Sequence, residues 1–173
     1  MRARACFSAG ALLSGAILCL SGSSCSDSSI DSGQSEVKVS VQRLRDAVQA
    51  KNLDSIMEYY VPDESLFVYD AVPPRQYVGA KAFRKDWENF LALFPGPIQV
   101  EVVDWTVSTE GNLAYGYGPF RVSGIGKDGN PLDLIVRVTD VYRKIGGKWV
   151  CVHEHASWPV DLTTGKADLT SKP

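Results

Sequence analysis

The sequence predicts an α+β fold, because helical periodicity dominates the residues before position 95 and strand periodicity dominates those after it. Apolar residues recur three or four positions apart in the first half. Long β-rich stretches separated by glycine-containing turns fill the second half. This order favours a strongly curved antiparallel sheet that wraps around the helices and encloses a pocket.

Three helices are expected in the first half. One apolar side with helical spacing follows residue 36, and its members are Val37, Val41, Leu44 and Val48. A short second helix begins at Asp54 and ends at Pro62, which cannot continue it. A third helix begins at Gly79, carries a broad aromatic stripe, and ends before Pro95.

The strands are expected in two groups. A short β-rich segment, 65–70, lies between the second and third helices. Four long strands then follow near residues 98–108, 113–123, 132–144 and 148–158. Asp128-Gly129 and Gly146-Gly147 suit hairpin turns, because glycine adopts positive φ at no steric cost.

The first 24 residues have the pattern of a secretory signal. A short basic region with Arg2 and Arg4 precedes a small and apolar run, 6–20, and serines at 21–24. We therefore expect the protein to be exported. Cys25 follows two serines, as in a bacterial lipoprotein, although Gly22 stands where the usual motif has leucine. Two outcomes stay open: a lipid-anchored periplasmic or cell-envelope protein, in which Cys25 is lipidated, and a secreted protein.

The rest of the chain divides into three parts. Residues 25–35 are rich in Ser, Asp and Gly and are expected to form a flexible tether. Residues 36–160 form the domain, and 161–173 form a tail with no assigned role. Without the signal, Cys25 and Cys151 are the only cysteines, so no disulfide framework is expected.

Composition narrows the classes of function. The chain of 173 residues is 45% hydrophobic and 22% charged, which is typical of one soluble globular domain. The formal net charge is −2, and Lys and Arg form no run, so nucleic-acid binding is not expected. Membrane contact is expected only through a lipid on Cys25.

Several segments together resemble the SnoaL-like, ketosteroid-isomerase-like branch of the nuclear transport factor 2-like superfamily. They are residues 50–54, 77–87, 137–139 and 147–157, and the most specific is the last, with Trp149, His153, His155 and Ser157. The resemblance covers roughly 37–159. It implies a cone-shaped fold with a deep pocket and commonly a homodimer formed on the sheet. It implies no single activity, because relatives include isomerases, cyclases, dehydratases and non-catalytic binding domains.

His153 and His155 are candidate catalytic residues. They are the only histidines and lie two apart on one expected strand, so a regular strand places both on the face of Trp149 and Cys151. That neighbourhood favours the inner, pocket-lining face, where histidine suits proton transfer near neutral pH. Glu154 would then point the other way. The alternative is a pair of structural histidines in a closed core.

Four further residues complete the candidate site. Asp70 ends the short strand, and the resemblance implies an acidic residue near this point that faces the pocket as a base; the alternative is a cap for the following turn. Arg137 lies in the middle of a strand, where an inner position would let it bind a ligand and an outer position would make it an ordinary solvated side chain. Tyr77 is expected at the pocket rim and Trp149 on the face of the histidines.

A metal site is not expected, although both histidines with Asp70 would make three ligands. No cofactor motif is present, because the glycines at 116–126 lie among strands and turns. The function expected is binding of a small, partly apolar organic molecule, with possible acid–base catalysis of the isomerase, dehydratase or hydrolase type. The alternative is a non-catalytic module for ligand binding or dimerisation.

Overall fold

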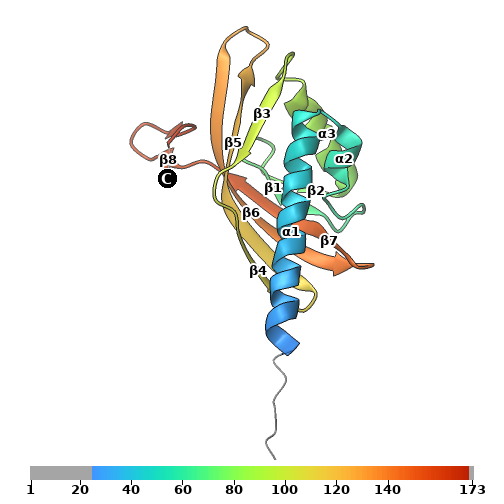
Figure 1. Cartoon of the computed structure of the whole chain (residues 1–173). Coiled ribbons are helices and arrows are strands. Elements are labelled where there is room, and N and C mark those ends of the chain that lie inside the picture. The colour runs from blue at the N-terminus through green and yellow to red at the C-terminus, as the bar shows by residue number, and fades with distance from the viewer. Residues whose placement is uncertain (1–24, 172–173) are drawn as a thin grey trace, which may run out of the picture.

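In the computed structural model, which describes residues 25–171, three helices cover one face of a curved sheet (Figure 1). The helices are α1 (Cys25–Gln49), α2 (Leu53–Met57) and α3 (Ala80–Leu91). The long α1 crosses the sheet, and α2 and α3 lie beside its C-terminal half (Figure 1). All four apolar residues that give α1 its helical spacing are buried, as the sequence predicts.

Seven strands form the main sheet, in the order β2-β1-β7-β6-β5-β3, with β4 also paired to β5. Their bounds are β1 Phe67–Tyr69, β2 Tyr77–Val78, β3 Ile98–Val102, β4 Thr106–Glu110, β5 Leu113–Ile125, β6 Pro131–Ile145 and β7 Lys148–Ser157. Two short strands, β8 (Val160–Asp161) and β9 (Lys166–Ala167), make a separate hairpin within the expected tail. That hairpin projects on the side of the sheet away from the helices (Figure 1).

Two expectations about the sheet need correction. The sheet is mixed rather than antiparallel, because β1 pairs in parallel with β7. The strand expected over 98–108 is broken at 103–105, and both halves, β3 and β4, pair with β5. At the break the backbone of Asp104 approaches β5 so closely that a Cβ on Gly118 would lie 2.6 Å from the Asp104 carbonyl oxygen. Glycine at 118 therefore permits the kink.

The tether expected over 25–35 is wrong, because α1 begins at Cys25 and includes that segment. Gly33 is buried against β4, where a Cβ would lie 3.3 Å from Thr109 Oγ1. Packing on β4 stabilises the N-terminal part of α1, in a segment whose composition alone predicts a flexible chain. The signal expected over 1–24 and the side chain of Cys25, the expected lipidation site, lie outside what the structure describes.

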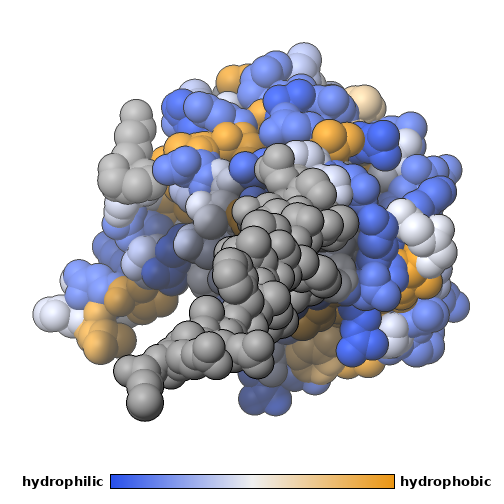
Figure 2. Space-filling model, turned by 60° about the horizontal axis from the view of Figure 1, so that its bottom comes forward, coloured by the Kyte–Doolittle hydropathy of each residue, from blue (hydrophilic) through white to orange (hydrophobic). Residues whose placement is uncertain are grey.

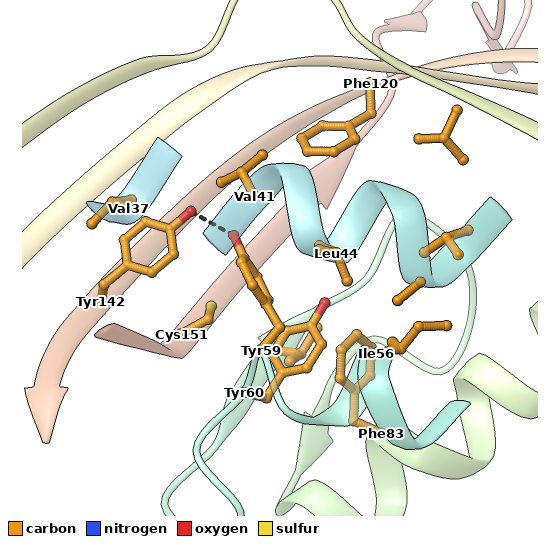
Figure 3. Packing of buried hydrophobic residues seen from close by; sticks show 14 of the residues in the cluster. Val37, Val41, Leu44, Ile56, Tyr59, Tyr60, Phe83, Phe120, Tyr142 and Cys151 are labelled. Carbon is orange, nitrogen blue, oxygen red and sulfur yellow. Dashed lines mark hydrogen bonds between the residues drawn. The ribbon is translucent and has the colours of Figure 1, made fainter. Parts of the chain in front are cut away.

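The core lies between the helices and the inner face of the sheet. Ile56 of α2 and Phe83 of α3 pack there around Tyr60, whose ring meets Phe83 edge to face with centroids 5.1 Å apart (Figure 3). The face turned forward in Figure 2 is mostly hydrophilic, with hydrophobic residues in small separate groups. Over residues 25–171, no helix combines the length and the apolar character needed to cross a bilayer.

The kink in the sheet gives a first prediction. We expect Gly118→Ala to lower the free energy of unfolding by about 1–3 kcal/mol, because the new methyl group meets backbone that has to move. Gly96→Ala is the matched control, since a Cβ at Gly96 meets nothing within 4 Å and its change stays within about 0.5 kcal/mol. Urea denaturation of both variants measures the difference. Equal stabilities would contradict this account of the kink.

Candidate functional site

A cavity of about 460 Å³ lies between the helices and the inner face of the sheet. This volume falls in the range of pockets that bind small organic molecules. Most of its wall is apolar, and aliphatic side chains come from α1 and from strands β3, β5 and β6. The aromatic side chains that line it are Tyr60, Tyr77, Phe83, Trp87, Phe90, Phe120 and Trp158.

Four carboxyl groups line this cavity, and we call them the acidic wall. Asp70 follows β1, Asp86 lies on α3, Asp140 on β6 and Glu154 on β7. The negative charges of Asp140, Asp70 and Asp86 all act to raise the pKa of Glu154, so the four groups interact as one cluster. Asp140 and Glu154 are buried, whereas Asp70 and Asp86 are partly exposed. The acidic wall therefore runs from the solvent side of the cavity to its interior.

Asp140 is held by two tyrosine hydroxyls. Tyr59 donates to Asp140 Oδ2 over 2.6 Å, and the Tyr142 hydroxyl lies 3.0 Å from the same oxygen. The two tyrosine hydroxyls lie 2.5 Å apart (Figure 3). Burial raises the pKa of Asp140 to about 7, although both hydrogen bonds act to lower it. The other oxygen, Oδ1, is buried without a hydrogen-bond partner among the described residues.

Glu154 lies directly opposite Asp140 in the pairing of β6 with β7. Tyr60 donates to Glu154 Oε2 over 2.7 Å. Burial, and then the charge of Asp140, raise the pKa of Glu154 well above its ordinary value. Two carboxylates side by side in a buried cross-strand pair repel each other, so at least one of them carries a proton near neutral pH.

Asp70 and Asp86 form the partly exposed end of the acidic wall. Tyr77 donates to Asp86 Oδ1 over 2.6 Å, and the backbone N–H of Ala71 donates to Asp70 Oδ1 over 2.6 Å. Burial, and then the neighbouring charge of Asp86, raise the pKa of Asp70 to about 7. Asp70 and Tyr77 both line the cavity, the position that the family resemblance implies for Asp70 and that is expected for Tyr77. At pH 7 the Asp70 carboxyl is poised either to accept or to donate a proton.

The expectation that His153 and His155 line the pocket is wrong. Val141 pairs with His153 but Tyr142 pairs with Cys151, so Val152 is an extra residue, a β-bulge in β7. The bulge reverses the alternation, and Glu154 rather than the histidines follows Cys151 on the inner face. His155 is exposed, and His153 Nδ1 lies 2.8 Å from the Phe67 carbonyl oxygen. Both rings meet Tyr69 of β1 on the outer face.

Arg137 and Trp149 also lie away from the cavity, contrary to expectation. Arg137 is exposed on the outer face, because its neighbours Val136 and Val138 take the inner positions of β6. Trp149 is buried and joins β7 to α1, since its Nε1 donates to Glu36 Oε2 over 3.0 Å. Lys144 donates to the same oxygen over 2.7 Å and its Nζ lies 5.6 Å from the Trp149 ring.

The described residues offer one group of possible metal ligands, Asp140, Cys151 and Glu154, with their ligand atoms within 4.8 Å of one another. Burial raises the pKa of the Cys151 thiol well above its ordinary value, and the thiol donates to the His153 carbonyl oxygen over 3.2 Å. Tyrosine hydroxyls already occupy one oxygen of each carboxyl. Burial raises the pKa of all three groups and so favours their protonated forms, whereas metal ligands are deprotonated. The set of both histidines with Asp70 does not assemble, because the histidines lie on the opposite face.

Sequence reasoning missed Asp86, Asp140 and Glu154. One signal was present for Asp140: Leu134, Val136 and Val138 alternate along β6, and Asp140 continues that series on the inner face. The same alternation places Arg137 outside. Glu154 had no such signal, because a bulge leaves no mark in the residue pattern.

The arrangement of three helices on a curved sheet with an internal cavity agrees with a comparison against known protein families. A SnoaL-like domain matches residues 37–161. The chain belongs to this family. The match spans α1 from its first core residue to β8, so it includes every strand of the main sheet and all four members of the acidic wall of this SnoaL-like domain.

Solved structures place this SnoaL-like domain in the nuclear transport factor 2-like superfamily. An NTF2-like protein of unknown function from Pseudomonas putida KT2440 is 29% identical with a TM-score of 0.74, over 83% of this chain and 98% of that one. A proposed dehydratase of the NTF2-like family from Streptomyces avermitilis shares the fold at 17% identity and a TM-score of 0.65, over 73% and 96%. A search of the curated proteins finds no match.

The raised pKa values predict a pH dependence of stability. Asp70 and Asp140 stay protonated in the folded chain up to about pH 7 but ionise near pH 4 when unfolded. The folded state therefore binds more protons in this window, and the free energy of unfolding falls as the pH rises from about 4 to 7. The exposed carboxyls with lowered pKa, such as Asp63 and Asp161, act only below that window.

Asp70→Asn tests this dependence, because it removes one linked proton. Between pH 4.5 and pH 8, the free energy of unfolding of the variant should rise by about 1–2 kcal/mol relative to that of the wild type. The gain is smaller than the full value of about 1.4 kcal/mol per pKa unit because Asp70 is partly exposed. Urea denaturation across the pH range measures it. Glu110→Gln, an exposed change outside the cavity, is the control. If the free energy of unfolding varies with pH in the same way for Asp70→Asn and the wild type, Asp70 does not have the raised pKa assigned to it.

Proposed function

We propose that this SnoaL-like domain binds a small, partly apolar organic molecule in its cavity and exchanges a proton with it through Asp70. The observation that carries the proposal is the position of the Asp70–Asp86–Tyr77 group at the partly exposed end of an otherwise apolar cavity of about 460 Å³. The apolar wall supplies binding by removing hydrocarbon surface from water. The carboxyl pair supplies a group whose charge changes near neutral pH.

The roles divide along the acidic wall. Asp70 is the general base or acid, because its pKa of about 7 keeps both protonation states populated at neutral pH. Tyr77 and Asp86 are positioning residues: the 2.6 Å hydrogen bond between them fixes Asp86 beside Asp70. Asp140 and Glu154 supply the polar surface deeper in the cavity, against which a polar group of the ligand lies. Isomerisation and dehydration are the reaction types that this set serves.

Ligand binding comes first in the test. Thermal denaturation of the purified protein against a panel of small carbonyl compounds, alcohols and amines identifies ligands that raise the melting temperature. Val136→Phe places a ring in the cavity, so it should abolish the stabilisation while the protein stays folded by circular dichroism. His155→Ala lies on the outer face and should leave the stabilisation unchanged. Equal stabilisation of Val136→Phe and wild type would show that the ligands bind elsewhere.

Proton exchange is tested on the ligands so found. In D₂O, nuclear magnetic resonance follows the exchange of ligand C–H protons for deuterium in the presence of the protein. Asp70→Asn should lower the exchange rate by about 10²–10⁴-fold, the usual contribution of a general base. His155→Ala should exchange at the wild-type rate. If no ligand exchanges faster with protein than without it, the domain is a binding module and the catalytic part of the proposal falls.

A further inference from the structure

The cavity has an unusual balance of charge for a site lined mainly by hydrocarbon. Four carboxyl groups line it, and Arg45 of α1 is the single basic residue among its described lining residues. Arg45 already binds Asp46, with Nε and Nη2 at 2.9 and 2.7 Å from Asp46 Oδ1. Among residues 25–171, the acidic wall therefore has no cationic partner. A carboxyl cluster in an apolar site is costly to ionise unless a positive charge enters.

Asp140 provides an independent sign of a missing partner. Its side chain is 1% exposed and lines the cavity, yet Oδ1 has no hydrogen-bond partner among the described residues. Buried carboxyl oxygens are nearly always hydrogen-bonded, since an unmet one costs free energy. The two tyrosine hydroxyls reach only the opposite oxygen, Oδ2. Oδ1 is thus a polar atom for which the described residues supply no donor.

The rest of the lining suits a positive charge. Tyr77, Phe83, Trp87 and Phe90 lie along one side of the cavity, and their ring centroids follow one another at 5.7, 6.1 and 5.5 Å. Aromatic faces attract cations as well as apolar groups. A carboxylate ligand, in contrast, would meet four acidic groups.

We propose that the ligand of this cavity is an organic amine, with a protonated nitrogen against the acidic wall and an apolar or aromatic body along the aromatic side. This inference rests on the proposed function, because it names the class of molecule that the same cavity binds. An ammonium group brings up to three N–H donors, so it can serve Asp140 Oδ1 and a second carboxyl together. It also offsets the repulsion between Asp70 and Asp86, and that between Asp140 and Glu154.

Binding of an amine is then linked to protons. Without a ligand, the acidic wall holds protons near pH 7, because the pKa values of Asp70 and Asp140 are raised to about 7. A bound cation favours the ionised carboxylates, so binding releases protons. The affinity for an amine therefore increases as the pH rises from 5.5 to 8. Other titratable or charged groups face the wall from the surrounding elements: Arg45, Tyr59, Tyr60, Tyr77, Tyr142 and Cys151. The pKa values of the four tyrosines and the thiol are raised, so these groups stay neutral over that range.

The experiment compares three probes with one naphthalene body: 1-naphthylmethylamine, 1-naphthylmethanol and 1-naphthoate. Isothermal titration of the purified protein at pH 7.5 should give a Kd for the amine at least tenfold below that for the alcohol, and the naphthoate should bind most weakly. Titration in two buffers of different ionisation enthalpy should detect proton release with the amine alone. From pH 7.5 to 5.5 the amine should lose affinity about tenfold while the alcohol keeps its own.

Variants locate the effect. Asp70→Asn should weaken the amine about tenfold and leave the alcohol unchanged, whereas Glu110→Gln, an exposed acid outside the cavity, should alter neither. Asp140→Asn provides a second member of the wall to test the same selectivity. If the alcohol or the naphthoate binds as tightly as the amine, or if both Asn variants keep the preference, the amine proposal is overturned while the binding cavity stands. If no probe binds, the amine proposal and the proposed binding function both fail.

Discussion

The structure depends on how one carboxyl group, Asp140, is accommodated inside the protein. Its hydrogen bond from Tyr59 crosses from the segment after α2 to the middle of β6, so it joins the helical layer to the sheet. Tyr142 lies two residues further along β6 and completes the contact. A hydrogen bond to an ionisable group in such surroundings is strong, and losing one partner leaves the other buried and unmet. The layers can therefore shift little without a cost at this point.

That constraint also shapes the cavity. Because Asp140 is fixed on the inner face of β6, its cross-strand neighbour Glu154 is fixed beside it, and Tyr60 is drawn to Glu154. Tyr59 and Tyr60 are consecutive, and each serves a different carboxyl, with ring centroids 5.0 Å apart and the rings nearly perpendicular. A single turn of chain thus supports both interior acids. Catalytic or binding groups held in this way are pre-organised, which is what a site for small molecules needs.

Much of this fold could be predicted from the sequence, and the part that could not has identifiable causes. The spacing of Val37, Val41 and Leu44 predicts the buried side of α1, and the glycine turns predict the hairpins of the sheet. The family resemblance predicts an acidic residue such as Asp70 in the cavity, and Tyr77 is predicted at its rim. The histidines were misplaced because strand alternation holds only without a bulge. The helical start at Cys25 was missed because the packing of Gly33 on β4 is a tertiary contact with no local sign.

The bulge at Val152 has a wider consequence. The bulge shifts the alternation of β7 by one residue. Before it, Trp149 and Cys151 are the buried residues of the strand, and after it, Glu154 and Ala156 are. The same residues paired without a bulge would present His153 and His155 to the inner face and Glu154 to the outside. On the β7 side, the interior would then carry imidazoles in place of one carboxyl group. Whether Val152 is bulged out of the pairing or paired regularly thus separates two different arrangements of the same strand within a single fold.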